Sequence, residues 1–493
     1  MGLSRRRFSA LPAAVLVGLT GLSAAPAHAA ASPNPARIVS ETRSGRVVTL
    51  TISTPAFTSP TKVAVDLPTG YDASPTKRWP VTYVLAGTMN TYASFNAVVG
   101  GVELTKAYPS IVVSPNGLSG YWSDWYNNGA GGPPEYETYV IDQLLPLIDQ
   151  RFRTVPTRAQ RAIAGVSMGG YGASMLAAEH PDLFSALASI SGADDSNLPP
   201  LAAALSASST FDGGAVDAIY GPRATQEVRW RGHNPTDLAD NLRGLDVQVR
   251  TANGIPNPGI GEQLLTADSV SCVIEGGVHM GSVSFHDQLT ALGVPHLWKD
   301  YGPGCHTAPN FKREISDSLL VLRRHFARGS GSPAAFSYSS IQPHFSIYGW
   351  DVRTDPARAL EFLRLTSVSA RRLTVHGSGT TTVTTPPLFR GAAAVRLVGA
   401  TTSSAVPDAT GRITFRVSLG AANRGQQFAL GTTTTVADRT VTLTPRAAAP
   451  VRTGTTPGPA RSLPTTGAPW RLALAAGVLL ITSAAARRRG RAR

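Results

Sequence analysis

One pentapeptide constrains the fold of this chain more than any other feature. Residues 165–169 read GVSMG, between a short apolar run at 161–164 that predicts a buried strand and a run at 170–180 that predicts a helix. A G-x-S-x-G sequence in this setting is typical of a nucleophile elbow, a strained turn that exposes a serine hydroxyl above the edge of a sheet. The glycines avoid side chains where backbone segments approach closely. The pattern predicts Ser167 as a nucleophile.

Strand-like and helical runs alternate on both sides of this turn. Strands are expected at residues 47–53, 61–67, 79–85, 110–113, 161–164, 187–191, 247–252 and 296–299. Helices are expected at residues 136–152, 170–180, 285–292 and 311–326, and Pro146 predicts a kink in the first of them. This alternation predicts a mostly parallel sheet covered by helices on both faces. The expected fold is therefore α/β, of the α/β-hydrolase type.

The chain changes character after residue 328. Residues 329–335 form a Gly/Ser/Pro linker, and residues 336–446 are rich in Thr and Val, with short strand-like runs between turn residues. That pattern predicts a smaller β-rich accessory domain. Residues 447–462 are rich in Pro, Gly and Thr and are expected to be a spacer. The catalytic domain is accordingly expected at residues 37–328.

The first 29 residues predict an export signal. Arg5, Arg6 and Arg7 precede an apolar stretch at 11–22, and a small-x-small cleavage site ends at Ala29. The arginines are typical of a twin-arginine signal, and an ordinary secretory signal is the alternative. In either case the protein is expected to work outside the membrane.

Residues 463–493 predict attachment to the cell wall of a Gram-positive, actinobacterial cell. They contain LPTTG at 463–467, an apolar stretch at 472–486 and an arginine-rich tail. The tail holds the apolar stretch in the membrane, while a sortase cleaves between Thr466 and Gly467 and joins Thr466 to peptidoglycan. Contact with the membrane is then transient and made by residues 470–486. A permanent membrane tether is the alternative.

The formal charge of +14 follows largely from the two ends of the chain. The terminal segments hold nine arginines and no acidic residue, which leaves +5 for the rest. This balance gives no indication of a nucleic-acid partner. His and Cys residues do not cluster at metal-ligand spacing, and nucleotide-phosphate motifs are missing, so neither a metal nor a cofactor is expected.

A serine nucleophile needs a histidine as base and an acid that orients the histidine. In this fold both follow the serine along the chain. The candidate bases are His279, His286, His296 and His306. His306 is preferred, because it lies in a loop between the strand expected at 296–299 and the final helix.

The identity of the catalytic acid is less clear from the sequence than that of the base. Its usual position follows the strand at 247–252, but Asn253 stands there, and the candidates that remain are Asp268, Glu275 and Asp287. Two cysteines in an exported protein predict a disulfide between Cys272 and Cys305. That disulfide would join the segment carrying Glu275 to the loop carrying His306, which favours Glu275. Alternatively, the disulfide is only structural and Glu275 is a solvated surface charge.

Over residues 37–328 the chain resembles the antigen 85 mycolyltransferases and related esterase D-like enzymes. The shared motifs are LAGT at 85–88, SDWY at 123–126, YETY at 136–139, GVSM at 165–168, GCH at 304–306, and Glu275 ten residues before Phe285. The resemblance implies Glu275 as the acid and the backbone N–H groups of Met168 and Thr88 as the oxyanion hole. It also implies substrate contacts by Asp124 and Trp125.

The chain departs from the mycolyltransferases at Ala86, Met89 and Ala308, where those enzymes have Asp, Arg and Trp, so trehalose is not implied as acceptor. The expected function is an exported serine esterase or acyltransferase that acts on lipid or glycan acyl esters. Ser167 forms an acyl-enzyme, which water or a sugar or glycerol hydroxyl resolves. The alternative is a non-catalytic binding or adhesion protein on a hydrolase scaffold, with the β-rich domain as its binding module.

Overall fold

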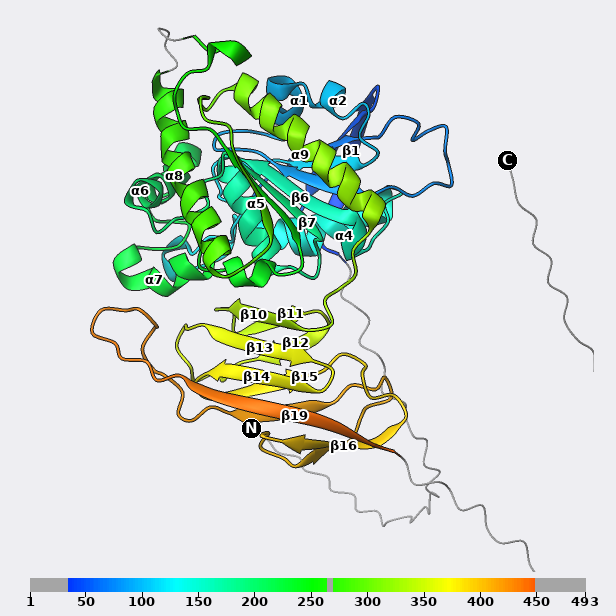
Figure 1. Cartoon of the computed structure of the whole chain (residues 1–493), viewed down its shortest axis with the longest axis vertical. Helices are drawn as coiled ribbons and strands as arrows, with labels where there is room; N and C mark the ends of the chain where they lie inside the picture. The colour runs from blue at the N-terminus through cyan, green and yellow to red at the C-terminus, as the bar shows by residue number, and fades with distance from the viewer. Residues whose placement is uncertain (1–33, 264–268, 448–493) are drawn as a thin grey trace, which may run out of the picture. The chain divides into compact units, whose positions relative to one another are not determined.

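The structure is a computed structural model that describes residues 34–263 and 269–447. A nine-stranded sheet forms the centre of its first part, which runs from Arg37 to Arg328 (Figure 1). The strand order is β1-β2-β3-β5-β4-β6-β7-β8-β9. The bounds are β1 (Arg37–Ser44), β2 (Val47–Ser53), β3 (Thr61–Asp66), β4 (Val81–Leu85), β5 (Ile111–Pro115), β6 (Arg161–Val166), β7 (Ala186–Ile190), β8 (Asp246–Thr251) and β9 (His296–Asp300). β1, β2, β3 and β5 pair antiparallel in that order, whereas all pairs from β5 across to β9 are parallel.

The central strands are continuous apolar runs because helices cover both faces of the sheet. β4, β5 and β7 are buried at every residue. The helices are α1 (Ser94–Val99), α2 (Gly101–Leu104), α3 (Tyr136–Thr138), α4 (Leu145–Arg151), α5 (Met168–Glu179), α6 (Pro199–Ser208), α7 (Arg223–Gly232), α8 (Ser269–Ala291) and α9 (Ala308–Arg328). α5 packs on β4, β6 and β7, and α9 packs on β7 and β8. The carboxyl ends of the parallel strands therefore share one edge, where loops can carry a site.

This architecture is the α/β-hydrolase fold that the alternation of runs predicted, and all eight predicted strands are present. The helix predicted at 136–152 is interrupted. A π-helical turn, η2 (Tyr139–Leu144), separates α3 from α4. Pro146 has no N–H to donate to the carbonyl four residues before it, as an α-helix requires. The wider hydrogen-bond pattern of the π-helix therefore comes directly before this proline.

The second part of the structure contains two antiparallel sheets, in agreement with the β-rich character of the sequence (Figure 1). The six-stranded sheet has the order β10-β13-β14-β19-β16-β17, and the four-stranded sheet β11-β12-β15-β18. The bounds are β10 (Phe336–Ser340), β11 (His344–Ile347), β12 (Trp350–Arg353), β13 (Leu363–Ser369), β14 (Arg372–Gly377), β15 (Thr380–Thr384), β16 (Ala392–Val398), β17 (Ser404–Ala405), β18 (Thr414–Ser418) and β19 (Ala437–Ala447). Their buried residues form a hydrophobic core separate from that of the nine-stranded sheet.

The predicted export signal, the predicted sorting signal at 463–493 and all but the first residue of the predicted spacer lie outside the described residues. Within residues 34–263 and 269–447, no helix is long and apolar enough to cross a membrane. The domain boundaries drawn from composition stay predictions.

Candidate active site

Ser167 lies on a sharp turn between β6 and α5, at the carboxyl edge of the parallel strands. Its backbone angles, φ 60° and ψ −123°, are ones that a residue with a side chain seldom adopts. Gly165 and Gly169 permit the turn. A Cβ at Gly165 would overlap the carbonyl group of Gly169, and a Cβ at Gly169 would overlap that of Leu85. The pentapeptide thus forms a strand–turn–helix elbow, with the serine at its strained position.

A carboxylate and a histidine pair beside this turn. His306 Nδ1 is 2.6 Å from Glu275 Oε2, and the Glu275 side chain is fully buried. Glu275 Oε1 accepts the backbone N–H of Ala252 at 3.0 Å and the hydroxyl of Ser191 at 2.7 Å. A carboxylate held in this way fixes the imidazole with a proton on Nδ1, which leaves Nε2 free to accept one.

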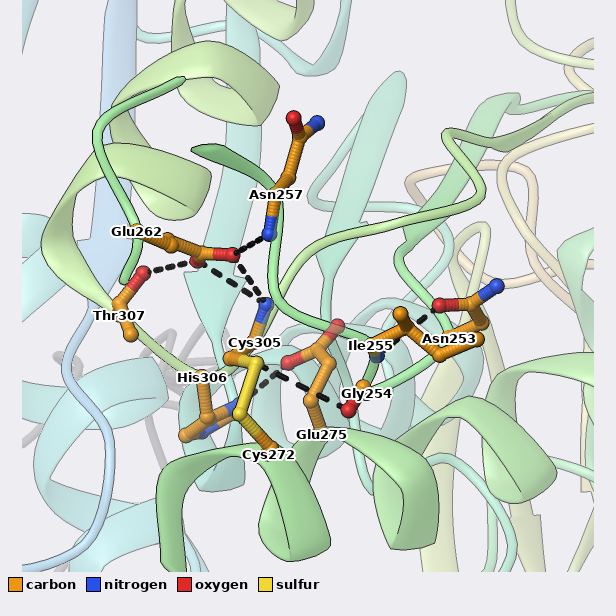
Figure 2. Close-up of a disulfide and its surroundings, with 10 residues drawn as sticks. All are labelled: Asn253, Gly254, Ile255, Asn257, Glu262, Cys272, Glu275, Cys305, His306 and Thr307. Atoms are coloured by element: carbon orange, nitrogen blue, oxygen red, sulfur yellow. Dashed lines mark hydrogen bonds and ion pairs between the residues drawn. A yellow bond between two sulfur atoms is a disulfide. The ribbon is translucent and has the colours of Figure 1, made fainter. Parts of the chain in front are cut away.

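The disulfide joins the two halves of this pair (Figure 2). Cys272 precedes Glu275 by about one turn of α8, and Cys305 directly precedes His306. The carboxylate of Glu262 holds the same loop by accepting the backbone N–H of Cys305 at 3.0 Å. The loop that carries the histidine is therefore fixed to α8 by a covalent bond and to residue 262 by hydrogen bonds.

The alternative bases and acids are engaged or exposed elsewhere. On α8 and β9, His286 Nδ1 lies 2.7 Å from His296 Nε2, and His279 Nε2 lies 3.0 Å from Asp300 Oδ2. Asp287 is exposed, and Asp268 lies outside the described residues. The structure thus pairs His306 with Glu275, the acid that the predicted disulfide favoured.

Ser167 and His306 line the same cavity. Over the described part of the chain, the Ser167 hydroxyl makes no hydrogen bond to the imidazole, and the hydrogen bonds of Ser167 are made by its backbone N–H and carbonyl. Hydrogen bonds between catalytic groups are often long before a substrate arrives and tighten in the complex. The Glu275–His306 pair is therefore formed in this structure, and we expect the Ser167–His306 hydrogen bond to form when substrate binds.

Two backbone N–H groups are available at the elbow. Met168 is the first residue of α5, so its N–H has no acceptor within the helix. Thr88 lies in the turn after β4, where the Asn90 side-chain amide donates to the Thr88 carbonyl at 3.0 Å. A Cβ on Gly87 would come within 3.2 Å of the Ser167 Cβ, so this turn passes directly against the nucleophile. Both N–H groups lie in turns that adjoin Ser167, and their role as the oxyanion hole stays a prediction.

An apolar cavity of about 640 Å³ adjoins Ser167 and His306. Its walls come from α1, α6, α8, α9 and the short helix η4 (Ser209–Asp212), with Phe95, Leu201 and Val278 among the lining residues. No Asp, Glu, Lys or Arg within the described ranges lines it. Such a volume and lining suit an uncharged, largely aliphatic group.

Asp124 and Trp125 line a different cavity from the one that contains Ser167. Asp124 accepts the backbone N–H and the hydroxyl of Thr138, at 3.0 Å and 2.6 Å. Trp125 is buried and donates its indole N–H to the Gly120 carbonyl at 3.2 Å. Both side chains are engaged in local structure, and the substrate contacts that the resemblance implied for them stay a prediction.

A partly buried polar cluster that no sequence motif indicated lies at this second cavity. Possible ligand atoms of Glu137, Glu179 and His180 lie within 4.8 Å of one another, and His180 Nε2 is paired with Glu137 at 2.8 Å. Burial raises the pKa of Glu179 to about 7. Burial by itself lowers the pKa of His180, but the hydrogen bond and charge of Glu137 outweigh it and raise that pKa to about 9. The ion pair formed here neutralises the charge of Glu137, one of the two carboxyl groups of the cluster.

Comparison with known proteins places most of this first part in one family. Residues 54–320 match the family described as "Putative esterase". The chain is 31% identical to Esterase Rv1288 of Mycobacterium tuberculosis over 283 residues, covering 55% of this chain and 58% of that protein. It is 29% identical to the Diacylglycerol acyltransferase/mycolyltransferase Ag85A of Mycobacterium leprae over 236 residues, covering 45% of this chain and 67% of that protein. The chain therefore spans less than two thirds of the length of the esterase.

Solved structures resemble this chain over the same part. Mycobacterium tuberculosis MPT51 is 19% identical with a TM-score of 0.47, and covers 57% of this chain and 100% of its own. A ferulic acid esterase is 21% identical with a TM-score of 0.43, and covers 57% of this chain and 98% of its own.

Proposed function

This chain belongs to the esterase family, and from that premise we propose that it is a serine esterase or acyltransferase that works through an acyl-enzyme on Ser167. The observation that carries the proposal is the Glu275–His306 pair, 2.6 Å apart, beside the strained elbow that presents the serine. Relatives named as an esterase and as an acyltransferase/mycolyltransferase support the same chemistry.

In the first half of the proposed reaction, His306 Nε2 takes the proton of the Ser167 hydroxyl as Oγ attacks the ester carbonyl carbon. The backbone N–H groups of Met168 and Thr88 stabilise the oxyanion that forms, at roughly 3–4 kcal/mol per donor. Collapse of this intermediate breaks the ester C–O bond, and the leaving alkoxide takes the proton back from His306. An acyl-enzyme and a free alcohol result.

In the second half, His306 removes a proton from water or from an acceptor alcohol, whose oxygen attacks the acyl-enzyme carbonyl carbon. The second tetrahedral intermediate expels Ser167, which regains its proton from the imidazole. Water gives a carboxylic acid, and a sugar or glycerol hydroxyl gives a new ester. The two outcomes differ only in the nucleophile that enters the site.

The cavity supports an ester with an aliphatic acyl group as substrate. Each buried methylene contributes about 0.8 kcal/mol, and the described lining offers no charge that would favour an ionic substituent. Met89, Phe211 and Val273 are exposed apolar side chains at this cavity, which extend its apolar surface outward. Lipid acyl esters of a cell envelope fit this surface better than small polar esters.

The proposed place of action is outside the cell, on the wall. The predicted export signal at 1–29 and the predicted sorting signal at 463–493 support this part of the proposal, with sortase and peptidoglycan as partners. Deletion of residues 463–493 is expected to release the protein from the wall fraction into the medium. An unchanged distribution between wall and medium would contradict wall attachment.

The proposal is tested by ester turnover in Ser167→Ala. Loss of the nucleophile is expected to lower kcat by at least about 10³-fold while the far-UV circular dichroism stays unchanged. Ser316→Ala is the matched control, because among the described residues the Ser316 hydroxyl bonds only the carbonyl of Lys312 on its own helix. Turnover retained by Ser167→Ala would refute the assignment. Product analysis with and without glycerol separates hydrolysis from transfer.

A further inference from the structure

A second carboxyl group lies directly behind the proposed acid. Ser191 Oγ is 2.7 Å from Glu275 Oε1 and 3.0 Å from Glu314 Oε2, so the serine bridges α8 and α9. All three residues are fully buried. Ser191 follows β7 with a φ of 44°, and its N–H donates to the Arg250 carbonyl at 2.8 Å, which fixes where its hydroxyl lies. The position of Ser191 between the two carboxyl groups is therefore fixed by the backbone and by burial.

The hydrogens in this bridge can be counted. A serine hydroxyl has one hydrogen and can donate it to one carboxyl group. The other short contact is a hydrogen bond only if that carboxyl is itself protonated and donates to Ser191 Oγ. If Glu275 and Glu314 were both ionised, one anion would face a serine lone pair in a fully buried site, which is strongly unfavourable.

Glu275 is the better site for the negative charge. It accepts the N–H of Ala252 at 3.0 Å and lies 2.6 Å from His306 Nδ1. Glu314 Oε1, by contrast, has no hydrogen-bond partner among the residues that the structure describes. Burial, and then the charge of Glu275, raise the pKa of Glu314 well above its ordinary value.

The other charged groups around Glu314 do not offset this. Arg313, its neighbour on α9, lowers the pKa of Glu314 by a smaller effect. β8 carries Asp246 and Arg250, which are engaged with His325 and Arg328 and with Tyr301. β7 and α1, which also pack against α9, carry no charged residue.

We propose that Glu314 is a positioning residue that works as a neutral acid, donating its hydrogen to Ser191 so that Ser191 donates its own to Glu275. These two hydrogen bonds keep Glu275 ionised and oriented toward His306. The effect of this relay on kcat rests on the proposed function. No bond other than these hydrogen bonds is made or broken, and no net proton is taken up.

Infrared spectroscopy tests the protonation without any substrate. At about pH 9, where Glu179 with its pKa of about 7 is ionised, the full-length protein is expected to show the C=O band of a buried carboxylic acid, and Glu314→Gln is expected to remove it. Glu361→Gln is the matched control: Glu361 is buried in the β-rich part and paired with Arg358 at 3.1 Å, so its replacement should leave the band. A band that persists in Glu314→Gln, or no band in the wild type, would overturn the proposal. This result stands even if the protein proves not to turn over esters.

Kinetics test the positioning role. Glutamine keeps an N–H donor toward Ser191, so Glu314→Gln is expected to stay within about threefold of wild type in kcat, with the acid limb of its pH profile unmoved. Ser191→Ala and Glu314→Ala are expected to lower kcat by about 10- to 100-fold, the range for losing a hydrogen bond to a charged group. A shifted acid limb in Glu314→Gln, or a loss in it as large as in Ser191→Ala, would overturn the proposal.

Discussion

Glu275→Gln changes one charge and almost no volume. In the wild type, Glu275 Oε1 accepts the hydroxyl of Ser191 and the N–H of Ala252, and Oε2 lies 2.6 Å from His306 Nδ1. A glutamine that keeps its oxygen on the first two donors must turn its NH₂ group toward His306. Two N–H donors cannot face each other, so the imidazole takes the tautomer with its proton on Nε2. It can then no longer accept the proton of Ser167.

The opposite amide orientation would restore the imidazole but bury the NH₂ group against the N–H of Ala252. An unsatisfied buried donor costs about 1–3 kcal/mol, and this orientation creates more than one. The tautomer change should therefore prevail, and kcat is expected to fall on the order of 10⁴-fold, as when an orienting acid is lost from a triad. That ratio corresponds to about 5.5 kcal/mol.

The assay is stopped-flow turnover of a nitrophenyl ester, with steady-state kcat and the burst of acylation measured together. Both phases should fall in Glu275→Gln, because His306 serves acylation and deacylation alike. Glu361→Gln, a buried Glu→Gln change in the β-rich part, controls for the loss of a buried charge. A loss in kcat of less than about tenfold would refute the orienting role of Glu275 and the tautomer argument with it.

Three further predictions concern the cavity, the disulfide and the polar cluster. With nitrophenyl esters, kcat/KM should rise about fourfold per methylene while the acyl chain lies in the cavity. Ile274→Asp, in the lining, should reduce this preference and Val270→Asp, exposed on the same helix, should not; a flat dependence on chain length would contradict the cavity assignment. Replacing Cys272 and Cys305, 33 positions apart, by serine should lower the free energy of unfolding by roughly 4 kcal/mol and reduce kcat; equal urea midpoints would contradict this. Burial raises the pKa of Glu179 to about 7, so its contribution to stability is present below its ordinary pKa and is lost as the pH rises through about 7. Glu179→Gln should thus gain on the order of 3 kcal/mol over wild type at about pH 8 and little at about pH 5, and an equal difference at both would count against the assignment.

The sequence predicted the central sheet well because parallel strands covered on both faces are continuous apolar runs. β1 was missed because most of its residues are exposed and polar, so no apolar alternation marks it. The prediction found only the last part of α8. Gly276 and Gly277 interrupt its apolar pattern, although the helix runs unbroken from Ser269 to Ala291.

Within the site, local motifs were enough to propose Ser167 and His306, and the cysteines favoured Glu275. Glu314 and Ser191 carried no local signal. They are 123 positions apart and meet only because α9 packs on the sheet at the end of β7. Such contacts depend on tertiary packing, so no motif or fixed spacing in the sequence indicates them.

The most direct test of the central claim is peptide mass spectrometry of the folded, disulfide-bonded protein after brief exposure to a fluorophosphonate. The account predicts a covalent adduct on the peptide containing Ser167, formed in the wild type and absent in Ser167→Ala. It also predicts that adduct formation slows in Glu275→Gln, because the probe needs the same activated hydroxyl. No adduct, or an adduct on another residue with Ser167 unmodified, would contradict the claim that Ser167 is the nucleophile.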